Sequence, residues 1–356
     1  MSEFPRHIRQ VSFPPIGAAG QAKLRAAKVL LVGLGALGTR HAELLVRAGV
    51  GSLTLVDRDV IELSNLQRQT LFTTADLGRP KALTAAQHLN AIDPEIKIDA
   101  RAEEFSADGA LAVARGHDLI LDGTDNFETR FLINETALEL GIPWVMAAVV
   151  GSDGQMQPIV PRPPAPGSAT TSATASATTS ATACLVCLLE EIPSQPGPTC
   201  ETAGVIGPAV AAVSALACAE ALKILTGDFA ALSGPVFFDL WRNQWQFLQR
   251  TAPRADCAAC ARGERPLLNG ERGATEAVRY CGTRTVQIRP PRPLQLDFQS
   301  LQKSLPAHYQ PEIVEGLLRL RSGGSEFILF PGGRALVRDI DSPEAARRLY
   351  AQILGV

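Results

Sequence analysis

The chain has 356 residues, which allows two or three domains, and 46% of them are hydrophobic, enough for a sizeable core. The formal net charge of −2 gives no strongly basic field, which argues against nucleic acid or an anionic membrane as a partner. The sequence shows no uninterrupted apolar run of about 18 residues and no charged-then-apolar leader at its start, so we expect a soluble cytoplasmic protein without a membrane span.

A nucleotide-binding pattern lies near the start of the chain. The apolar run 29–32 predicts a buried parallel strand. Three glycines follow it in the G-x-G-x-x-G spacing: Gly33, Gly35 and Gly38. A second predicted strand, 53–56, ends at Asp57, at about the spacing expected for the acid that holds a ribose hydroxyl. This pattern predicts a nucleotide site, although it does not distinguish a nicotinamide cofactor from ATP, and a purely structural strand–turn–helix unit shares part of it.

The predicted helix after these glycines has one apolar face. We place four residues on it: Leu37, Leu44, Leu45 and Ala48. The first glycine permits a tight turn, the second lets a phosphate approach the backbone, and the third lets the helix pack close to the strand.

Polar residues follow the second strand, at the edge of the sheet where doubly wound folds bind ligands. They include Asp59, Asn65 and Arg68. Lys81 follows at the start of a predicted helix, 81–90, where the helix dipole disfavours a cation. A lysine there is usually solvated, so it gains a functional meaning only if an anion binds nearby.

A further predicted strand, 119–121, leads into a turn with two carboxylates, Asp122 and Asp125. Carboxylates at this position could hold Mg²⁺ beside a triphosphate. Capping of the next helix by Asp125 or Asn126 explains the same residues equally well.

The remaining predicted elements continue the alternation of strand and helix. They are a strand at 96–100, a helix at 127–140, a strand at 144–150 and a further strand at 154–160. This order predicts an α/β fold with a Rossmann-like, doubly wound and mostly parallel sheet that has helices on both faces.

The alternation then breaks at residues 161–183, a proline-rich and then Ser/Ala/Thr-rich insert that we expect to be disordered. Two C-x-x-C pairs flank the next segment: Cys184 and Cys187, then Cys257 and Cys260. Four thiolates suit a tetrahedral Zn²⁺ without an open position, so we predict a structural zinc site. A redox dithiol is the alternative, but neither pair stands at the strand–helix junction that such a motif requires.

Cys200 lies at the end of a proline-rich loop, before a predicted helix at 208–225. A cysteine near a helix N-terminus can act as a nucleophile, and it can equally be a small capping or packing residue. Residues 237–248 predict a hairpin that leads to the second cysteine pair.

The composition of the sequence changes again near residue 266, where a polar segment begins. We expect a first domain at 1–265, a linker at 266–279 and a small α+β module at 280–356. The module contains a predicted hairpin, with strands at 327–330 and 335–337, and a final helix at 342–354.

Several motifs in order make residues 6–262 similar to the ThiF/MoeB/HesA adenylyltransferases, the bacterial relatives of ubiquitin-activating enzymes. Besides the glycine motif and the cysteine pairs, they are R-H-I-R-Q at 6–10, D-R-D at 57–59, S-N-L-Q-R-Q at 64–69, G-R-P-K at 78–81, D-G-T-D-N-F-E-T-R at 122–130 and T-C-E-T-A-G-V at 199–205. The C-terminal module resembles the extension of some bacterial ThiF-like proteins. It does not resemble a rhodanese domain, so a sulfur donor would be a separate protein, such as a cysteine desulfurase or a rhodanese.

The resemblance implies specific roles. The three glycines would line the ATP pocket, Asp57 would hold the ribose, and Asp125 would place Mg²⁺. Three residues would contact the phosphates: Asn65, Arg68 and Lys81. Arg9 would reach the partner's ATP across a homodimer interface, and Cys200 matches the family cysteine on a crossover loop.

The implied reaction is adenylation of the C-terminal Gly-Gly of a ubiquitin-like sulfur carrier, in thiamine (thiazole) or molybdopterin biosynthesis. Three alternatives stay open: a nicotinamide-dependent oxidoreductase, a non-catalytic binder of ubiquitin-like proteins, and an adenylating enzyme for a peptide or a tRNA base. Arg68, Lys81 and Asp125 argue against the first, because a dinucleotide enzyme needs no triphosphate clamp.

Overall fold

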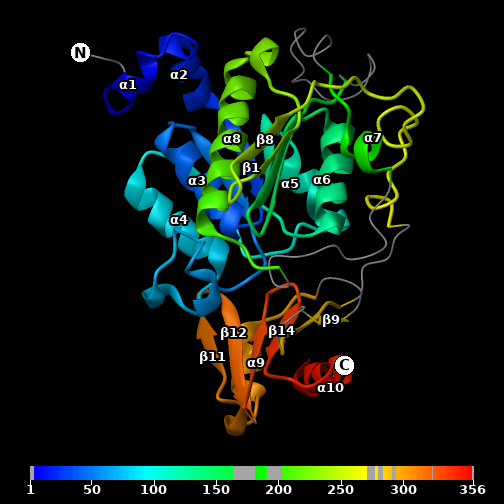
Figure 1. Ribbon diagram of the computed structural model, residues 1–356. Coiled ribbons are helices and arrows are strands. Elements are labelled where there is room, and N and C mark those ends of the chain that lie inside the picture. The colour runs from blue at the N-terminus through cyan, green and yellow to red at the C-terminus, as the bar shows by residue number, and fades with distance from the viewer. Residues whose placement is uncertain are drawn as a thin grey trace. The chain divides into compact units, whose positions relative to one another are not determined.

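The computed structural model describes residues 4–162, 181–190, 203–270, 277–279, 284–290, 294–322 and 324–354. Cys200 and most of the Ser/Ala/Thr-rich insert lie outside the described residues. The chain forms two compact units, Met1–Arg272 and Gly273–Val356 (Figure 1).

The first unit is built on an eight-stranded sheet with the order β3-β2-β1-β4-β5-β6-β7-β8. Its strands are β1 Lys28–Val32, β2 Ser52–Val56, β3 Lys97–Arg101, β4 Leu119–Asp122, β5 Trp144–Val150, β6 Asp153–Ile159, β7 Val236–Asp239 and β8 Gln244–Phe247. The pairs from β3 to β5 are parallel, and β6, β7 and β8 extend the sheet with antiparallel pairs. The predicted Rossmann-like fold is confirmed, because the central strands carry the parallel α/β order.

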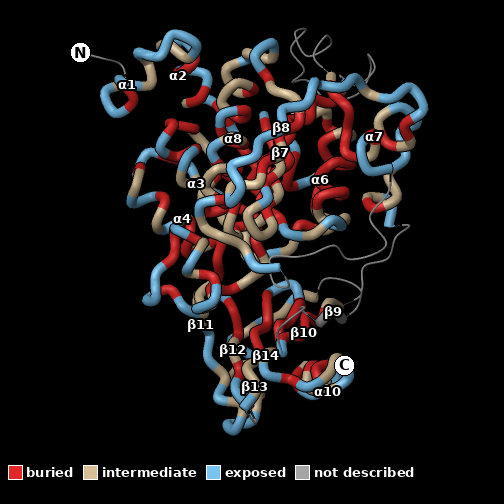
Figure 2. Tube along the Cα trace, viewed as in Figure 1, coloured by how far each residue is buried: buried red, intermediate tan, exposed pale blue. Residues whose placement is uncertain are grey.

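Helices cover both faces of this sheet (Figure 1). They are α1 Ile8–Val11, α2 Gly17–Ala26, α3 Ala36–Arg47, α4 Lys81–Ile92, α5 Ala107–Ala114, α6 Phe127–Leu140, α7 Leu185–Leu189 and α8 Gly207–Thr226. Successive residues of β1 enter different cores: Val29 packs with α3 and α8, whereas Leu30 packs with α5 and α6. In Figure 2, the buried residues, drawn in red, follow these central strands.

Two details differ from the sequence analysis. Three of the four residues placed on the apolar face of the helix, Leu37, Leu45 and Ala48, are buried, but Leu44 is 38% exposed, so its placement there was wrong. Helix α5 was not predicted. It has only eight residues, and because most of them are alanine or glycine, the helical spacing of large apolar side chains is hard to recognise.

Helix α8 is, among the described residues, the one helix whose length and composition would allow it to cross a membrane. Its buried face packs on α3 and on the strands β5 and β6, and half of its apolar window is buried inside the protein. These contacts explain its apolar composition as that of a core helix.

The second unit contains a six-stranded antiparallel sheet with the order β11-β12-β13-β14-β10-β9. Its elements are β9 Ala277–Arg279, β10 Val286–Ile288, α9 Phe298–Ser304, β11 Glu312–Val314, β12 Leu317–Ser322, β13 Ser325–Leu329, β14 Ala335–Arg338 and α10 Pro343–Leu354. Ala346, Tyr350 and Ile353 of α10 join the core of this sheet. The predicted α+β character, the hairpin and the final helix are confirmed.

Candidate functional site

The glycine turn between β1 and α3 fits closely against the turn after β4. Gly33 has φ +88°, and a Cβ atom at this residue would lie 2.7 Å from the carbonyl oxygen of Gly123. A Cβ at Gly38 would lie only 1.9 Å from the carbonyl oxygen of Gly33. A Cβ at Gly35, by contrast, would have no neighbour closer than 3.9 Å. Gly33 and Gly38 are therefore required by packing, while Gly35 leaves its backbone open to a ligand.

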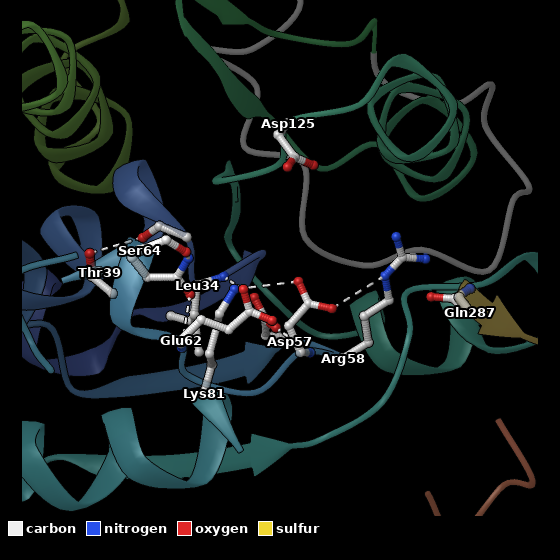
Figure 3. A network of polar contacts seen from close by, with 12 residues as sticks. Leu34, Thr39, Asp57, Arg58, Glu62, Ser64, Lys81, Asp125 and Gln287 are labelled. Carbon is white, nitrogen blue, oxygen red and sulfur yellow. Dashed lines mark hydrogen bonds and ion pairs between the residues drawn. The ribbon is translucent and has the colours of Figure 1, made fainter. Parts of the chain in front are cut away.

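Asp57 connects the glycine turn to the end of β2 (Figure 3). Its Oδ2 atom accepts a 2.5 Å hydrogen bond from the backbone N–H of Leu34, and its Oδ1 atom accepts one of 2.7 Å from the N–H of Asp59. Burial raises the pKa of the Asp57 carboxyl group above its usual value, and the charge of Lys81 partly offsets that effect. The carboxylate is thus fixed beside the open backbone of Gly35.

Lys81 is the first residue of α4 and it is buried rather than solvated. Its Nζ atom lies 3.3 Å from Oδ2 of Asp59. Burial acts to lower the pKa of Lys81, but the carboxylates of Asp59, Asp57 and Asp125 outweigh it and leave the pKa above its usual value. Lys81 therefore departs from the usual case of a solvated lysine at a helix start, because its buried ammonium group is held beside the carboxylate of Asp59.

Asn65 and Arg68 lie on the segment that joins β2 to α4. Asn65 ends the short 3₁₀ helix Leu63–Asn65, and its Oδ1 atom accepts a hydrogen bond of 3.2 Å from the N–H of Glu62. The Arg68 guanidinium donates to the carbonyl oxygen of Ser64 at 2.8 Å. Because β2 ends and α4 begins at the same edge of the sheet, this segment borders the glycine turn.

The turn between β4 and α6 separates its two carboxylates. Asp122 is fully buried and its Oδ2 atom lies 2.7 Å from Nε of Arg130, so its charge is already paired. Asn126 is the N-cap of α6, since its side chain accepts from the N–H of Thr129 at 2.8 Å. Asp125 is exposed at this turn (Figure 3). Of the two carboxylates, Asp125 is the one available to a cation.

Arg9 lies on α1, and its side chain is exposed, with no hydrogen bond or ion pair to any residue that the structure describes. Its neighbours fix the helix: Arg6 donates to the carbonyl oxygen of Ile92 at 2.9 Å, and Gln10 donates to that of Ala48 at 2.8 Å. The backbone at Arg9 is thus anchored, while its guanidinium stays on the surface.

The four predicted cysteines meet in one cluster. The Sγ–Sγ distances are 3.8 Å for Cys184–Cys187, 3.7 Å for Cys184–Cys257 and 3.5 Å for Cys187–Cys260, and all four sulfur atoms lie within 4.8 Å of one another. A tetrahedral Zn²⁺ with Zn–S bonds of about 2.3 Å sets its sulfur atoms about 3.8 Å apart. The donor set and its spacing fit a zinc ion.

The cluster is held by α6, which sequence reasoning did not connect with it. Asn134 Oδ1 accepts from the N–H of Leu185 at 2.9 Å, and Glu135 accepts from the N–H groups of Leu267 and Leu268 at 3.1 and 3.0 Å. One helix therefore begins beside Asp125 and, two turns later, supports the cysteine cluster.

The β7–β8 hairpin exposes an aromatic surface that the sequence analysis described only as a hairpin. Trp241 is 81% exposed and Phe247 is 68% exposed, with Trp245 beside them. A groove of about 410 Å³ adjoins this hairpin and is lined from β5, β6, β7 and β8. Strand β8 is also an edge strand of the sheet. Large aromatic side chains on an exposed edge are typical of a protein-binding surface.

Together, these observations describe an α/β protein with a Rossmann-like sheet and a four-cysteine cluster that could hold a metal ion. The family model described as the ThiF family matches residues 7–259, and the chain belongs to this family.

The chain is also similar to named relatives along its length. It is 37% identical to the sulfur carrier protein ThiS adenylyltransferase of Bacillus subtilis, over 98% of this chain and 99% of that protein. It is 37% identical to the sulfur carrier protein adenylyltransferase of Thermus thermophilus, over 79% of this chain and 98% of the relative. A crystal structure of Escherichia coli MccB with ATP shares the fold, with a TM-score of 0.58 and 22% identity over 72% of this chain and 74% of that one. The Bacillus subtilis match spans nearly the whole chain, so it includes the second unit.

Proposed function

We propose that this protein adenylates the C-terminal Gly-Gly carboxylate of a ubiquitin-like sulfur carrier at the expense of ATP. The observation that carries the proposal is the buried ammonium group of Lys81, held 3.3 Å from Asp59 at the edge of the sheet where Gly35 leaves the backbone open. A buried cation at this place suits the phosphates of ATP, and the names of the relatives supply the class of protein substrate.

In the reaction, a carboxylate oxygen of the carrier attacks the α-phosphorus of ATP. A new O–P bond forms, the bond between the α-phosphorus and the bridging oxygen breaks, and pyrophosphate leaves with the electron pair. The step needs positive charge around the phosphates more than covalent help. We assign that role to Arg68 and Lys81, while the neutral side-chain amide of Asn65 would donate a hydrogen bond to the phosphates.

The rest of the nucleotide would lie on the glycine turn. Gly33 and Gly38 would shape it, Gly35 would let the phosphates approach, and Asp57 would accept hydrogen bonds from the ribose hydroxyls. Asp125 would hold Mg²⁺, which when bound neutralises charge on the phosphates.

Two further assignments rest on the family pattern. Arg9, exposed on its anchored helix, would complete the site of a partner chain in a homodimer. Cys200, which lies outside the described residues, would either attack the acyl-adenylate, which forms a thioester and releases AMP, or take no part while a persulfide donor attacks the acyl-adenylate and releases AMP. The zinc held by the four cysteines would have a structural role, because four thiolates leave no open position.

The carrier would dock on the aromatic surface of the β7–β8 hairpin. Trp241 in the turn of the hairpin and Phe247 on the edge strand β8 offer exposed apolar area, which suits a small β-rich protein partner. The sulfur donor would be a separate cysteine desulfurase or rhodanese. The Bacillus subtilis relative, which is named for ThiS, favours a carrier of that type, as in thiazole synthesis, over a molybdopterin carrier.

Carrier-dependent exchange of pyrophosphate into ATP tests the proposal. Each Gly-Gly-ending carrier of the source organism is assayed separately, with the same carrier lacking its last two glycines as the control. We expect exchange with at least one intact carrier and none with the truncated form. Failure of every carrier to stimulate exchange, or hydride transfer with a nicotinamide cofactor, would overturn the proposal.

A further inference from the structure

Arg130 is a buried arginine on the first turn of α6, and the reaction as proposed gives it no task. Its side chain is 7% exposed. The Nε atom pairs with Oδ2 of Asp122 at 2.7 Å, and Nη2 donates to the carbonyl oxygens of Thr124 at 3.0 Å and Ala147 at 3.2 Å. All of these contacts are inside the protein, so this guanidinium is not free to bind a substrate phosphate.

Asp122 completes a clamp around Thr124. Its Oδ1 atom accepts hydrogen bonds from the backbone N–H of Thr124 at 2.9 Å and from the hydroxyl group of the same residue at 2.6 Å. Asp122 therefore holds the peptide group before Thr124, and Arg130 holds the peptide group after it. Both peptide planes of Thr124 are thus fixed, and the second of them leads directly into Asp125.

Two more contacts fix the position of this turn. On the far side of Asp125, Asn126 caps α6 through the N–H of Thr129. On the near side, Gly123 sits so close to the glycine turn that a Cβ there would lie 2.3 Å from the carbonyl oxygen of Gly33. The carboxylate of Asp125 is exposed, yet its backbone is held relative to the turn that would carry the phosphates.

A buried ion pair adds little to the stability of a fold, because removing two charges from water costs free energy. Packed apolar side chains of the same size have no such cost. The pair here is aimed at the two peptide groups around Thr124, which suggests a role in geometry. We propose that Asp122 and Arg130 are positioning residues that hold Asp125 where it can bind Mg²⁺ together with ATP. This inference rests on the proposed function, since it assumes that the site binds ATP with a divalent cation.

The test measures the dissociation constant of ATP, without any carrier, in excess EDTA and again in excess Mg²⁺. The ratio of the two constants is the Mg²⁺ enhancement. Asp125→Ala defines the protein without the metal-binding carboxylate. Arg130→Met keeps the bulk of the side chain and removes the fork of donors, and Arg115→Met, at an exposed arginine after α5, is the matched control. Thermal melting of each variant checks folding.

We expect Arg130→Met to lose roughly tenfold of the enhancement while ATP affinity in EDTA stays as in the unaltered protein, the size typical of losing a group that orients a metal ligand. In the Asp125→Ala background, adding Arg130→Met should cause no further loss of enhancement, because Arg130 acts through Asp125. An unchanged enhancement in folded Arg130→Met protein would overturn the inference, and so would an equal loss of affinity with and without Mg²⁺.

Thr124→Val provides a second variant if Arg130→Met does not fold. It removes only the hydroxyl bond to Asp122, so we expect a smaller but measurable loss of enhancement, and no loss would overturn the inference. The outcomes also separate the two proposals. Absence of ATP binding in the unaltered protein overturns the proposed function together with this inference, whereas normal enhancement in the variants overturns the inference alone.

Discussion

The ammonium group of Lys81 lies 3.3 Å from the Oδ2 atom of Asp59, and the backbone N–H of Lys81 donates to the carbonyl oxygen of the same residue at 2.9 Å. Asp59 in turn donates its N–H to the carboxylate of Asp57 at 2.7 Å. The acid proposed for the ribose and the cation proposed for the phosphates are thus joined through one residue, so the distance between them is set by the fold.

Replacement of this cation is the most direct check of the phosphate site. Lys81→Met should lower the rate of pyrophosphate exchange by at least about a hundredfold, because one buried positive charge beside the reacting phosphates lowers the barrier by about 3 kcal/mol. Lys97→Met, at an exposed lysine on β3, is the control and should change little. Exchange that survives in Lys81→Met would place the phosphates elsewhere.

The glycine turn allows packing and binding to be separated by two similar substitutions. Gly38→Ala would bring a Cβ to 1.9 Å from the Gly33 carbonyl oxygen, so it should lower the free energy of unfolding by about 3 kcal/mol. Gly35→Ala meets no atom within 3.9 Å and should cost about 1 kcal/mol or less, while raising the dissociation constant of ATP. Urea titration and nucleotide binding measure the two effects. Equal stability of both variants would contradict this division.

Much of the fold could be predicted because its central elements have strong local signals. The helix 127–140 and the strand 144–150 were predicted with the bounds that the structure gives, since an Asn cap, a closing glycine and an X-Pro step mark them. Helix α5 lacked such a signal. Leu44 was misplaced because a helical period identifies an apolar stripe, but not how far the neighbouring helix α8 covers it.

The residues of the candidate site could be named from the sequence, but the contacts between them could not. Nothing local distinguishes Asp122 from Asp125, and only the tertiary partner Arg130 shows that Asp122 is already paired. Gly123 escaped notice for the same reason, because the close approach that requires it comes from Gly33, ninety positions away in the sequence. A lysine at a helix start gave no sign of burial, which depends on where the carboxylates lie in space.

Zinc should stabilise the first unit without taking part in adenylation. We expect the purified protein to contain about one zinc ion per chain, and Cys260→Ser to lose it. Without zinc, the free energy of unfolding should fall by about 2 kcal/mol, which lowers the Tm by about 5 °C or more. Cys218→Ala, at a buried thiol outside the cluster, is the control that should keep its zinc. Metal analysis measures the zinc content and thermal melting measures the Tm. A zinc-free Cys260→Ser protein with an unchanged Tm would contradict the structural role.

His41 should give the protein a measurable sensitivity to acid. It is fully buried on α3, both ring nitrogen atoms lack a partner among the described residues, and burial lowers its pKa to about 3. The unfolded chain binds a proton at His41 more readily than the folded protein does. The contribution of neutral His41 to the unfolding free energy is therefore complete above about pH 6.5, and it is lost as the pH falls from there towards 3. The loss approaches about 1.4 kcal/mol per pH unit.

His41→Met removes this titration and places an apolar side chain at the same buried position. Urea unfolding at pH 7, 6 and 5 should show a shallower fall of the unfolding free energy in His41→Met than in the unaltered protein. Identical slopes would mean that the imidazole is protonated inside the fold. The comparison of slopes matters, since His7 and His117, whose pKa values burial also lowers, contribute equally to both proteins.

A shared active site can be tested by mixing two inactive chains. Arg9→Ala should lack the cation offered to the partner, and Lys81→Ala should lack the cation of its own pocket, so each homodimer should be inactive in pyrophosphate exchange. Co-purified heterodimers combine one intact Lys81 pocket with one intact Arg9, on opposite chains, and should regain about half of the activity per dimer. A control mixture of Arg9→Ala with Arg9→Ala/Lys81→Ala should stay inactive. If the first mixture also stays inactive although heterodimers form, Arg9 acts within its own chain, and the exposed position of its side chain on α1 needs another explanation.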